Sequence, residues 1–233
     1  LSHTHYDHLD NDSAKMIGNS ALWLCPLGVG DLLTNLGITN YVEMNWWDTY
    51  EFKLPSSSDS SDSSDATVVF VPAAHWTNRG LNDVNTCLWG GFCVKVNPKS
   101  KTKASSDTSS GDNGNGNDNA NANDSTNFFF MGDSGYNKEM YKHIGDKYGP
   151  FDCAGIGIGA YRPRDFMKSQ HVTPLESCYT HQDIKSKFSV GIHWGTFPLA
   201  LEDDIEPAFE LGRARETCGL SHRDICTVDI GET

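Results

Sequence analysis

The sequence of 233 residues predicts a single α/β domain. Short apolar runs such as residues 67–71 and 128–131 are rich in β-branched and aromatic residues, a composition that favours buried strands. Residues 28–37 instead carry leucines on one face of a helical period. Segments of the two kinds alternate along the chain, and this alternation is typical of α/β folds.

In the first half of the chain, Asp10 or Asp12 can lie near the start of a short helix over residues 9–20. Gly37 closes the helix predicted over residues 28–37. Extended backbone is favoured in four further segments, and these predicted strands are residues 21–26, 41–44, 67–71 and 86–96.

In the second half, Pro174 suits the first turn of a helix and Gly219 suits the end of another. The predicted helices are residues 137–148, 174–183 and 207–218, and the predicted strands are residues 128–131, 153–161 and 189–192. Three glycines within residues 153–161 indicate that another part of the molecule approaches that backbone closely.

Two low-complexity tracts interrupt this pattern. Residues 56–65 consist of Ser and Asp, and residues 104–127 are almost entirely Ser, Asp, Asn, Gly and Ala. Such segments cannot bury apolar surface, so we predict that both are disordered loops within a domain that spans residues 1–233. The tracts also contribute much of the formal net charge of −13. No basic patch remains, which argues against a nucleic-acid partner.

The composition also indicates in which cellular compartment the chain is expected. No apolar run approaches the roughly 18–20 residues of a membrane span. The seven cysteines are an odd, scattered set without a Cys-x-x-Cys pair, which favours a reduced, intracellular compartment over a disulfide framework. We therefore expect an intracellular chain without a transmembrane segment, with peripheral membrane association at most.

The opening ten residues contain the densest cluster of possible metal ligands, in the pattern His-x-His-x-Asp-His. In an extended segment, side chains two residues apart point the same way, so His3 and His5 can reach one metal ion. Asp7 and His8 are then free to reach a second ion. Only two residues precede His3, so we also expect that an N-terminal part of the domain is missing.

Three further candidate ligands follow predicted strands. His75, Asp133 and His193 each come within a few residues of a strand end. In α/β folds, the carboxyl ends of strands are the edge at which sites assemble. Together with the opening cluster, these residues predict one metal site.

Five imidazoles and two carboxylates exceed what one tetrahedral zinc ion can use, so the ligand set predicts two Zn²⁺ ions. The first would be held by His3, His5 and His75. The second would be held by Asp7, His8 and His193, and Asp133 would bridge the two. A pair of zinc ions about 3.5–4 Å apart lowers the pKa of a bridging water to near 7 and supplies a hydroxide nucleophile. This predicts a hydrolase for phosphodiesters, lactones, thioesters or amides.

At these residues the sequence resembles the metallo-β-lactamase superfamily, and within it the N-acyl-phosphatidylethanolamine-hydrolysing phospholipases D. Beyond the ligands, the similar runs include Pro-Ala-Ala-His-Trp, Phe-Phe-Phe-Met-Gly-Asp-Ser-Gly-Tyr, Ile-Gly-Ala-Tyr-Arg-Pro-Arg-Asp-Phe-Met-Lys, Gln-His-Val-Thr-Pro-Leu-Glu and Ile-His-Trp-Gly-Thr-Phe. The resemblance spans nearly the whole chain outside the two tracts.

The resemblance implies an αββα sandwich that lacks its N-terminal half-sheet, and a zinc enzyme that cleaves N-acyl-phosphatidylethanolamine to an N-acylethanolamine and phosphatidic acid. It implies catalytic roles for Asp7, Asp133 and His171, the last contacting phosphate or donating a proton. It also implies a phospholipid substrate at a membrane surface and a possible homodimer. His143, His181 and His222 have no comparable context, and we expect them at the surface.

Two alternatives remain open at this point. The chain could be another hydrolase of the same fold, such as a lactonase or a different phosphodiesterase. It could also be a non-catalytic remnant that binds metal or lipid.

Overall fold

The computed structural model describes residues 1–54, 64–97 and 125–229. Its larger sheet has seven strands in sequence order, β3 to β9. The strands are β3 (Thr49–Leu54), β4 (Ser64–Val71), β5 (Gly91–Val96), β6 (Thr126–Phe130), β7 (Cys153–Gly157), β8 (Ser189–Ile192) and β9 (Ile225–Cys226). Neighbours from β3 to β6 are antiparallel, and neighbours from β6 to β9 are parallel.

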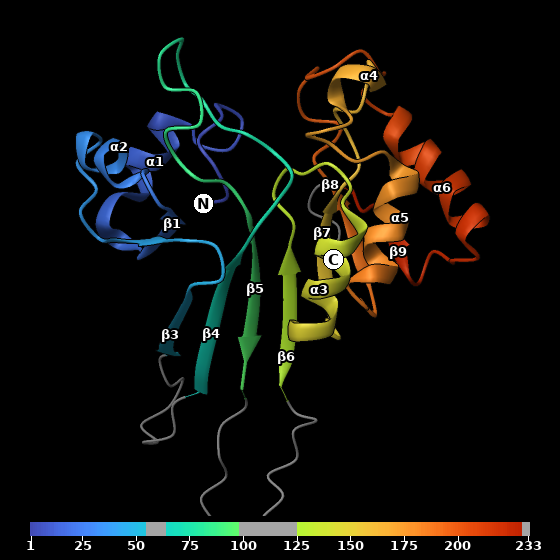
Figure 1. Cartoon of the computed structure of the whole chain (residues 1–233), viewed down its shortest axis with the longest axis horizontal. Coiled ribbons are helices and arrows are strands. Elements are labelled where there is room, and N and C mark those ends of the chain that lie inside the picture. Colours follow the sequence, from blue (N-terminus) through green and yellow to red (C-terminus); the bar gives the residue numbers. More distant parts are fainter. Residues whose placement is uncertain (55–63, 98–124, 230–233) are drawn as a thin grey trace, which may run out of the picture.

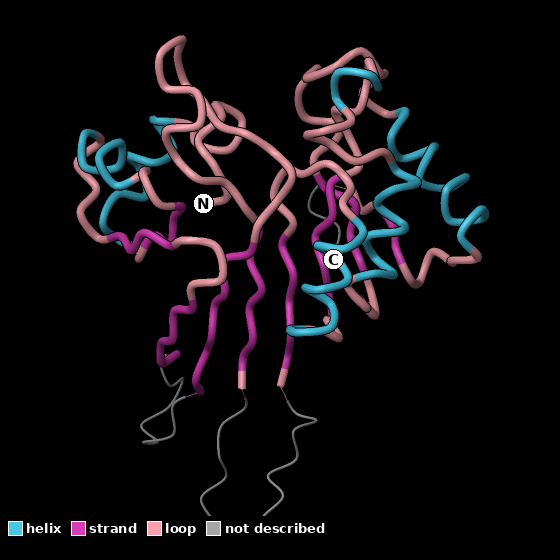
Figure 2. Tube along the Cα trace, viewed as in Figure 1, coloured by secondary structure: helices cyan, strands magenta, loops and turns pink. Residues whose placement is uncertain are grey.

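A smaller parallel sheet pairs β1 (Trp23–Pro26) with β2 (Tyr41–Met44). The helices lie on the outer sides of the strands, as Figures 1 and 2 show. They are α1 (Asn11–Ile17), α2 (Gly30–Asn35), α3 (Lys138–Tyr148), α4 (Arg164–Met167), α5 (Pro174–Asp183) and α6 (Glu206–Cys218), with a 3-10 turn, η1, at Gly18–Ser20.

Alternating side chains of β4 divide the core into layers. Val69 and Val71 face a cluster that includes Tyr141 and Ile144 of α3. Val68 and Phe70 face the opposite way, into a cluster that includes Met44 of the smaller sheet. Successive side chains alternate between the two faces because the backbone of a strand is pleated. One face of the larger sheet therefore packs on helices and the other packs on the smaller sheet.

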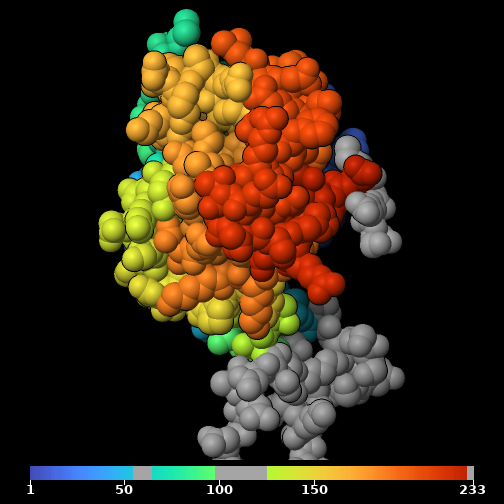
Figure 3. Space-filling view, turned by 90° about the vertical axis from the view of Figure 1, so that its right-hand side faces the viewer, coloured from blue at the N-terminus to red at the C-terminus, as the bar shows by residue number. Residues whose placement is uncertain are grey.

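The smaller sheet in turn packs on α1 and α2, through a buried cluster that contains Cys25 of β1, Ala14 of α1 and Leu33 of α2. The order of layers is thus helices, large sheet, small sheet, helices, which confirms the predicted αββα arrangement. The face shown in Figure 3 is formed largely by the C-terminal part of the chain, coloured orange and red, which includes α5 and α6. Within the described ranges, no helix has the length and apolar character needed to cross a bilayer.

Several sequence-based predictions need correction. The predicted tracts lie largely outside the described residues, but Ser64 and Asp65 belong to β4, and residues 126–127 begin β6. Cross-strand pairing draws these polar residues into the sheet: Asp65 pairs with Lys53, and Thr126 pairs with Val96. The strands β3 and β9 and the helix α4 were not predicted.

The prediction of a surface position for His181 is wrong. This residue is buried between α5 and β8, where its Nδ1 lies 2.8 Å from Ser189 Oγ. The polar partner, provided by the strand that follows α5, is what allows the imidazole to be buried. His143 and His222 are exposed, as predicted.

Helix α5 begins with a complete capping box, which gives a test of the local structure. Thr173 Oγ1 accepts from the backbone N–H of Glu176, and the Glu176 carboxylate accepts from the backbone N–H of Thr173. We expect Thr173→Ala to lower the free energy of unfolding by about 1 kcal/mol, the usual value of such a cap. Urea unfolding would measure this, and Thr217→Ala, at an exposed position of α6, is the control that should change little. An unchanged stability of Thr173→Ala would contradict the assignment.

Candidate metal centre

All seven predicted ligands meet at one edge of the larger sheet. His75 follows β4, Asp133 follows β6 and His193 directly follows β8. The opening segment, which carries the other four, enters between the two helical sides of the molecule, where the N-terminus is marked in Figure 1. The side chain of His3 is almost completely buried there, so this segment is part of the core.

The first group consists of His3, His5 and His75. His5 Nδ1 lies 3.0 Å from His3 Nε2 and 3.2 Å from His75 Nε2. Nitrogens that share a tetrahedral zinc ion, each about 2.0–2.1 Å from it, are roughly 3.3 Å apart. The spacing of these three nitrogens therefore fits one metal ion.

Partners on the far side of two rings orient this group. His3 Nδ1 lies 3.1 Å from Ser2 Oγ, and His75 Nδ1 lies 3.0 Å from the carbonyl oxygen of Gln170. A hydrogen bond from Nδ1 to that carbonyl leaves Nε2 of His75 unprotonated and free to bind a cation. The backbone of Gln170 thus positions the ring of His75, although the two residues lie far apart in the chain.

The second group consists of Asp7, His8, Asp133 and His193. Asp7 Oδ2 lies 3.1 Å from His8 Nε2 and 3.3 Å from His193 Nε2. Asp133 Oδ2 lies 3.0 Å and 3.4 Å from the same two nitrogens. Although His8 Nε2 is buried and close to both carboxylates, it makes no hydrogen bond of acceptable geometry. A buried polar atom of this kind suits a metal ligand.

Asp133 lies between the two groups. Besides its contacts in the second group, its Oδ2 is 3.7 Å from Nε2 of both His3 and His75. Burial alone would raise the pKa of this carboxyl, but His193 and His8 outweigh burial and hold it below its ordinary value. Asp133 is therefore a carboxylate whose Oδ2 atom lies close to imidazoles of both groups.

The protonation of the histidines also fits a metal site. Burial lowers the pKa of His3 well below its ordinary value and lowers that of His75 to about 3. Burial lowers the pKa of His5 as well. At neutral pH these rings are therefore unprotonated, which metal binding requires. Burial opposes protonation of His8 too, but Asp133 and Asp7 raise its pKa to about 9, because the two carboxylates stabilise a positive charge on this ring.

His171 lies at the border of both groups. Its Nδ1 is 3.9 Å from Asp133 Oδ2, and its ring stacks on that of His193 with centroids 5.4 Å apart. Together with His75 and Asp133 it forms a third set of possible ligand atoms. The structure thus places His171 beside the seven predicted ligands.

The backbone around His193 is constrained. His193 has a φ of 61°, which non-glycine residues rarely adopt. Its carbonyl oxygen would lie only 2.2 Å from a Cβ added to Gly159. The close approach predicted for the glycines of residues 153–161 therefore occurs at Gly159, whereas a Cβ at Gly155 or Gly157 would meet nothing closer than 3.5 Å.

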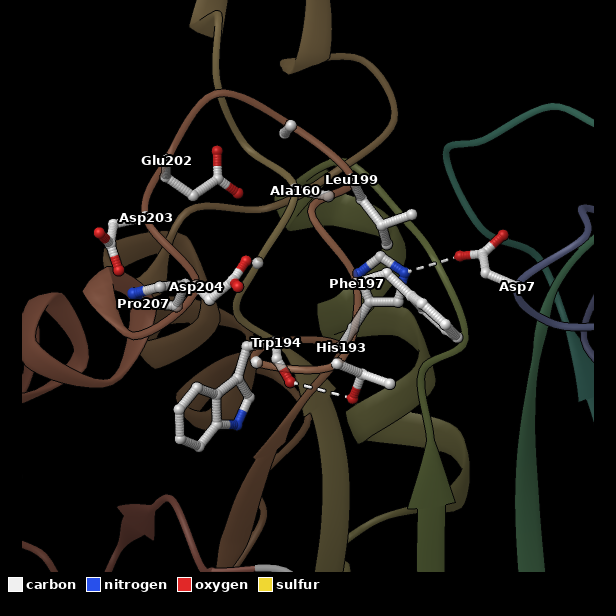
Figure 4. A pocket seen from close by; sticks show the side chains of 14 residues that line it. Asp7, Ala160, His193, Trp194, Phe197, Leu199, Glu202, Asp203, Asp204 and Pro207 are labelled. Carbon is white, nitrogen blue, oxygen red and sulfur yellow. Dashed lines mark hydrogen bonds and ion pairs between the residues drawn. The ribbon is translucent and has the colours of Figure 1, made fainter.

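A cavity of about 190 Å³ opens beside the second group. Asp7 and His193 lie on one side of it, and Figure 4 shows acidic side chains of residues 202–204 on the other. Phe197 and Leu199 add an apolar wall. Sequence reasoning identified Asp7 and His193 but gave no role to Phe197, Leu199 or residues 202–204, because the segment after His193 has no periodicity or ligand spacing that would single them out.

Comparison with known proteins shows which family this chain is similar to. The model of the beta-lactamase superfamily domain matches residues 1–117 and 120–194. N-acyl-phosphatidylethanolamine-hydrolyzing phospholipase D 1 of Caenorhabditis elegans is 36% identical over the whole chain. The mitochondrial enzyme of the same description from Saccharomyces cerevisiae is 29% identical over the whole chain. The chain spans 58% and 43% of these two relatives, about half of their length.

Solved structures share the fold. A metallo hydrolase of the archaeon Ignicoccus hospitalis superposes with a TM-score of 0.59 at 16% identity, covering the whole chain and 76% of that protein. The metallo-beta-lactamase fold protein YhfI of Bacillus subtilis gives a TM-score of 0.51 at 13% identity, covering the whole chain and 75% of that protein. The matched family, the shared fold and the clustered His and Asp side chains lead to one conclusion: this chain belongs to the beta-lactamase superfamily and has the metallo-β-lactamase fold.

Proposed function

We propose that the chain is the hydrolytic part of a zinc-dependent phosphodiesterase of the phospholipase D type, which cleaves N-acyl-phosphatidylethanolamine to an N-acylethanolamine and phosphatidic acid. The observation that carries this proposal is the convergence of five imidazoles and two carboxylates in a chain similar to enzymes of that description. Without the cluster, the similarity would indicate the family but not a working site.

The residues fit two zinc ions, which would be held by the groups around His5 and His8 and joined by Asp133. When bound, such ions act as Lewis acids toward a phosphoryl oxygen and make water a nucleophile near neutral pH. The surrounding residues position the ligands: Ser2 Oγ and the Gln170 carbonyl oxygen contact Nδ1 of His3 and of His75, respectively. Burial of His3 and Asp133 keeps water from competing for the ligand atoms.

In the proposed reaction, water oxygen forms a bond to phosphorus, and the bond from phosphorus to the ethanolamine oxygen breaks. The attacking water gives up one proton and the leaving oxygen takes one up, so the reaction consumes only water. His171, which lies between the two groups and beside the cavity residue His193, can contact a phosphate oxygen in this reaction. The apolar wall of the cavity is suited to the hydrocarbon part of a lipid.

Peripheral contact with a phospholipid surface is part of the proposal. Large apolar side chains are exposed close to the cavity, at Phe197, Leu199, Leu201 and Ile205. Exposed apolar groups near a site mark surfaces that bind lipid or protein. Their position would place the cavity toward the membrane that holds the substrate.

Zinc analysis combined with a substrate panel tests the function. We expect about two zinc ions per purified chain, and release of N-acylethanolamine from vesicles that contain N-acyl-phosphatidylethanolamine. The panel would include a lactone and a cyclic nucleotide, the substrates of the alternative hydrolases. Zinc binding with turnover of only those compounds would overturn the lipid assignment, and zinc binding without any turnover would favour a non-catalytic remnant.

The role of His171 has its own test. If His171 donates a hydrogen bond to phosphate, its removal should cost about 1.5–3 kcal/mol of transition-state stabilisation, or roughly 10- to 100-fold in kcat/KM for His171→Ala. His171→Asn keeps a side-chain donor and should retain more activity, and zinc content should be unchanged in both. An equal loss of about 10³-fold or more in both variants would instead assign proton donation to His171.

A further inference from the structure

The loop that carries four of the candidate ligands is fastened by an arginine from another segment. We call residues 3–9 the ligand loop. Arg79 Nη1 donates to the carbonyl oxygens of Thr4 and Leu9, both at 2.8 Å, and its Nη2 donates to Asn11 Oδ1 at 2.9 Å. One guanidinium thus connects the start of the ligand loop, its end, and the first residue of α1.

The middle of the ligand loop contacts the same arginine. The guanidinium carbon of Arg79 lies 4.2 Å from the centroid of the Tyr6 ring, and Tyr6 Oη donates to the Arg79 carbonyl oxygen at 2.9 Å. Tyr6 stands between the ligands His5 and Asp7, and its side chain is directed outward, with 66% of the residue exposed. Stacking on the arginine gives this exposed ring a fixed orientation.

Arg79 is itself held in place. The Asp83 carboxylate accepts from the backbone N–H groups of Arg79 and Gly80, at 3.0 and 2.7 Å. The same segment begins directly after the ligand His75, and the hydroxyls of Thr77 and Thr4 are hydrogen-bonded to each other in the interior. Arg79 therefore bridges from the segment of one distant ligand to the loop of four others.

We propose that Arg79 is a positioning residue that sets the metal affinity of the site by fixing the backbone of the ligand loop. This inference rests on the proposed metal-dependent function. The guanidinium donates hydrogen bonds to two backbone carbonyl oxygens and one side-chain amide oxygen, so these bonds fix the backbone conformation of the ligand loop. A lysine has a single ammonium in place of the planar fork of donors and cannot reproduce this set.

The test compares zinc affinity with stability in the intact chain. Zinc dissociation constants are measured by competition with a chromogenic chelator, and urea unfolding is measured on the metal-free protein. We expect Arg79→Lys and Arg79→Ala to weaken zinc binding by about 10- to 100-fold, the usual effect of residues that orient metal ligands. Adding methylguanidinium to Arg79→Ala should restore part of the affinity.

Two further variants complete the design. Arg213→Ala removes an exposed arginine that pairs with Glu210 on α6, and it should leave zinc affinity unchanged. Tyr6→Leu keeps the guanidinium bonds of Arg79 and removes the stacked ring with its hydroxyl, so it should weaken binding by roughly two- to fivefold even if the Arg79 variants do not fold. Loss of stability with unchanged zinc affinity would show that Arg79 is merely structural and overturn the proposal.

The zinc measurement needs no lipid, which separates this inference from the proposed reaction. If the wild-type chain binds zinc but cleaves no phospholipid, the reaction is refuted, while the Arg79 variants still show whether the arginine sets the zinc affinity. A wild-type chain without zinc affinity refutes both.

Discussion

Asp133→Asn is expected to remove both metal ions and to reduce hydrolysis by more than 100-fold. The Oδ2 atom of Asp133 lies within 3.9 Å of five imidazole nitrogens, from both groups of the site and from His171. An amide of the same shape carries no negative charge, so it would be a far weaker ligand for either cation. The loss should exceed the roughly 10- to 100-fold cost of residues that only orient a ligand. Elemental analysis and the rate of N-acylethanolamine release measure the two effects.

The comparison with a remote carboxylate makes this result specific. Asp146→Asn alters an exposed side chain that pairs with Lys185, and it should keep full zinc content and activity. Circular dichroism would show that both variants are folded. If Asp133→Asn retained two zinc ions and the wild-type rate, the shared-ligand arrangement would be wrong.

The fold was largely predictable where local composition decides the structure. The apolar runs of β4 and β6 favour extended backbone, and both strands contribute side chains to the clusters on the two faces of the sheet. Strand β3 was missed although Tyr50 and Phe52 alternate with polar residues. Strand β9 has only two residues and forms because Ser189 and Val190 of β8 offer pairing partners. Such a strand has no signature in its own sequence.

In the site, too, local sequence patterns were predictive and contacts between distant segments were not. The His-x-His-x-Asp-His cluster is a local signal, and the predicted strand ends indicated where His75, Asp133 and His193 would meet. The contact of Arg79 with the Leu9 carbonyl joins residues 70 positions apart, and that of Gln170 with His75 joins residues 95 apart. Periodicity and spacing along one sequence contain no information on such contacts, because they depend on how the layers pack.

Gly159→Ala is expected to disable the second group of ligands while the rest of the site persists. The new Cβ would lie 2.2 Å from the carbonyl oxygen of His193 and 3.3 Å from Cα of Trp194, so the backbone after β8 must move. His193 already has a φ of 61° and follows directly on its strand, which leaves it little freedom to compensate. A displacement of about 1 Å at a reacting centre can cost roughly 100-fold in rate.

The matched control lies two residues earlier, at the end of β7. A Cβ at Gly157 would meet only Val172 Cγ2, at 4.0 Å, so Gly157→Ala should keep its metal content and rate. We expect zinc analysis of Gly159→Ala to give about one ion per chain, since His3, His5 and His75 are on other segments. Two ions and a normal rate in Gly159→Ala would mean that the segment after β8 can shift without moving His193. Equal losses in both variants would mean that the damage comes from β7 and the residues after it, and not from the contact with His193.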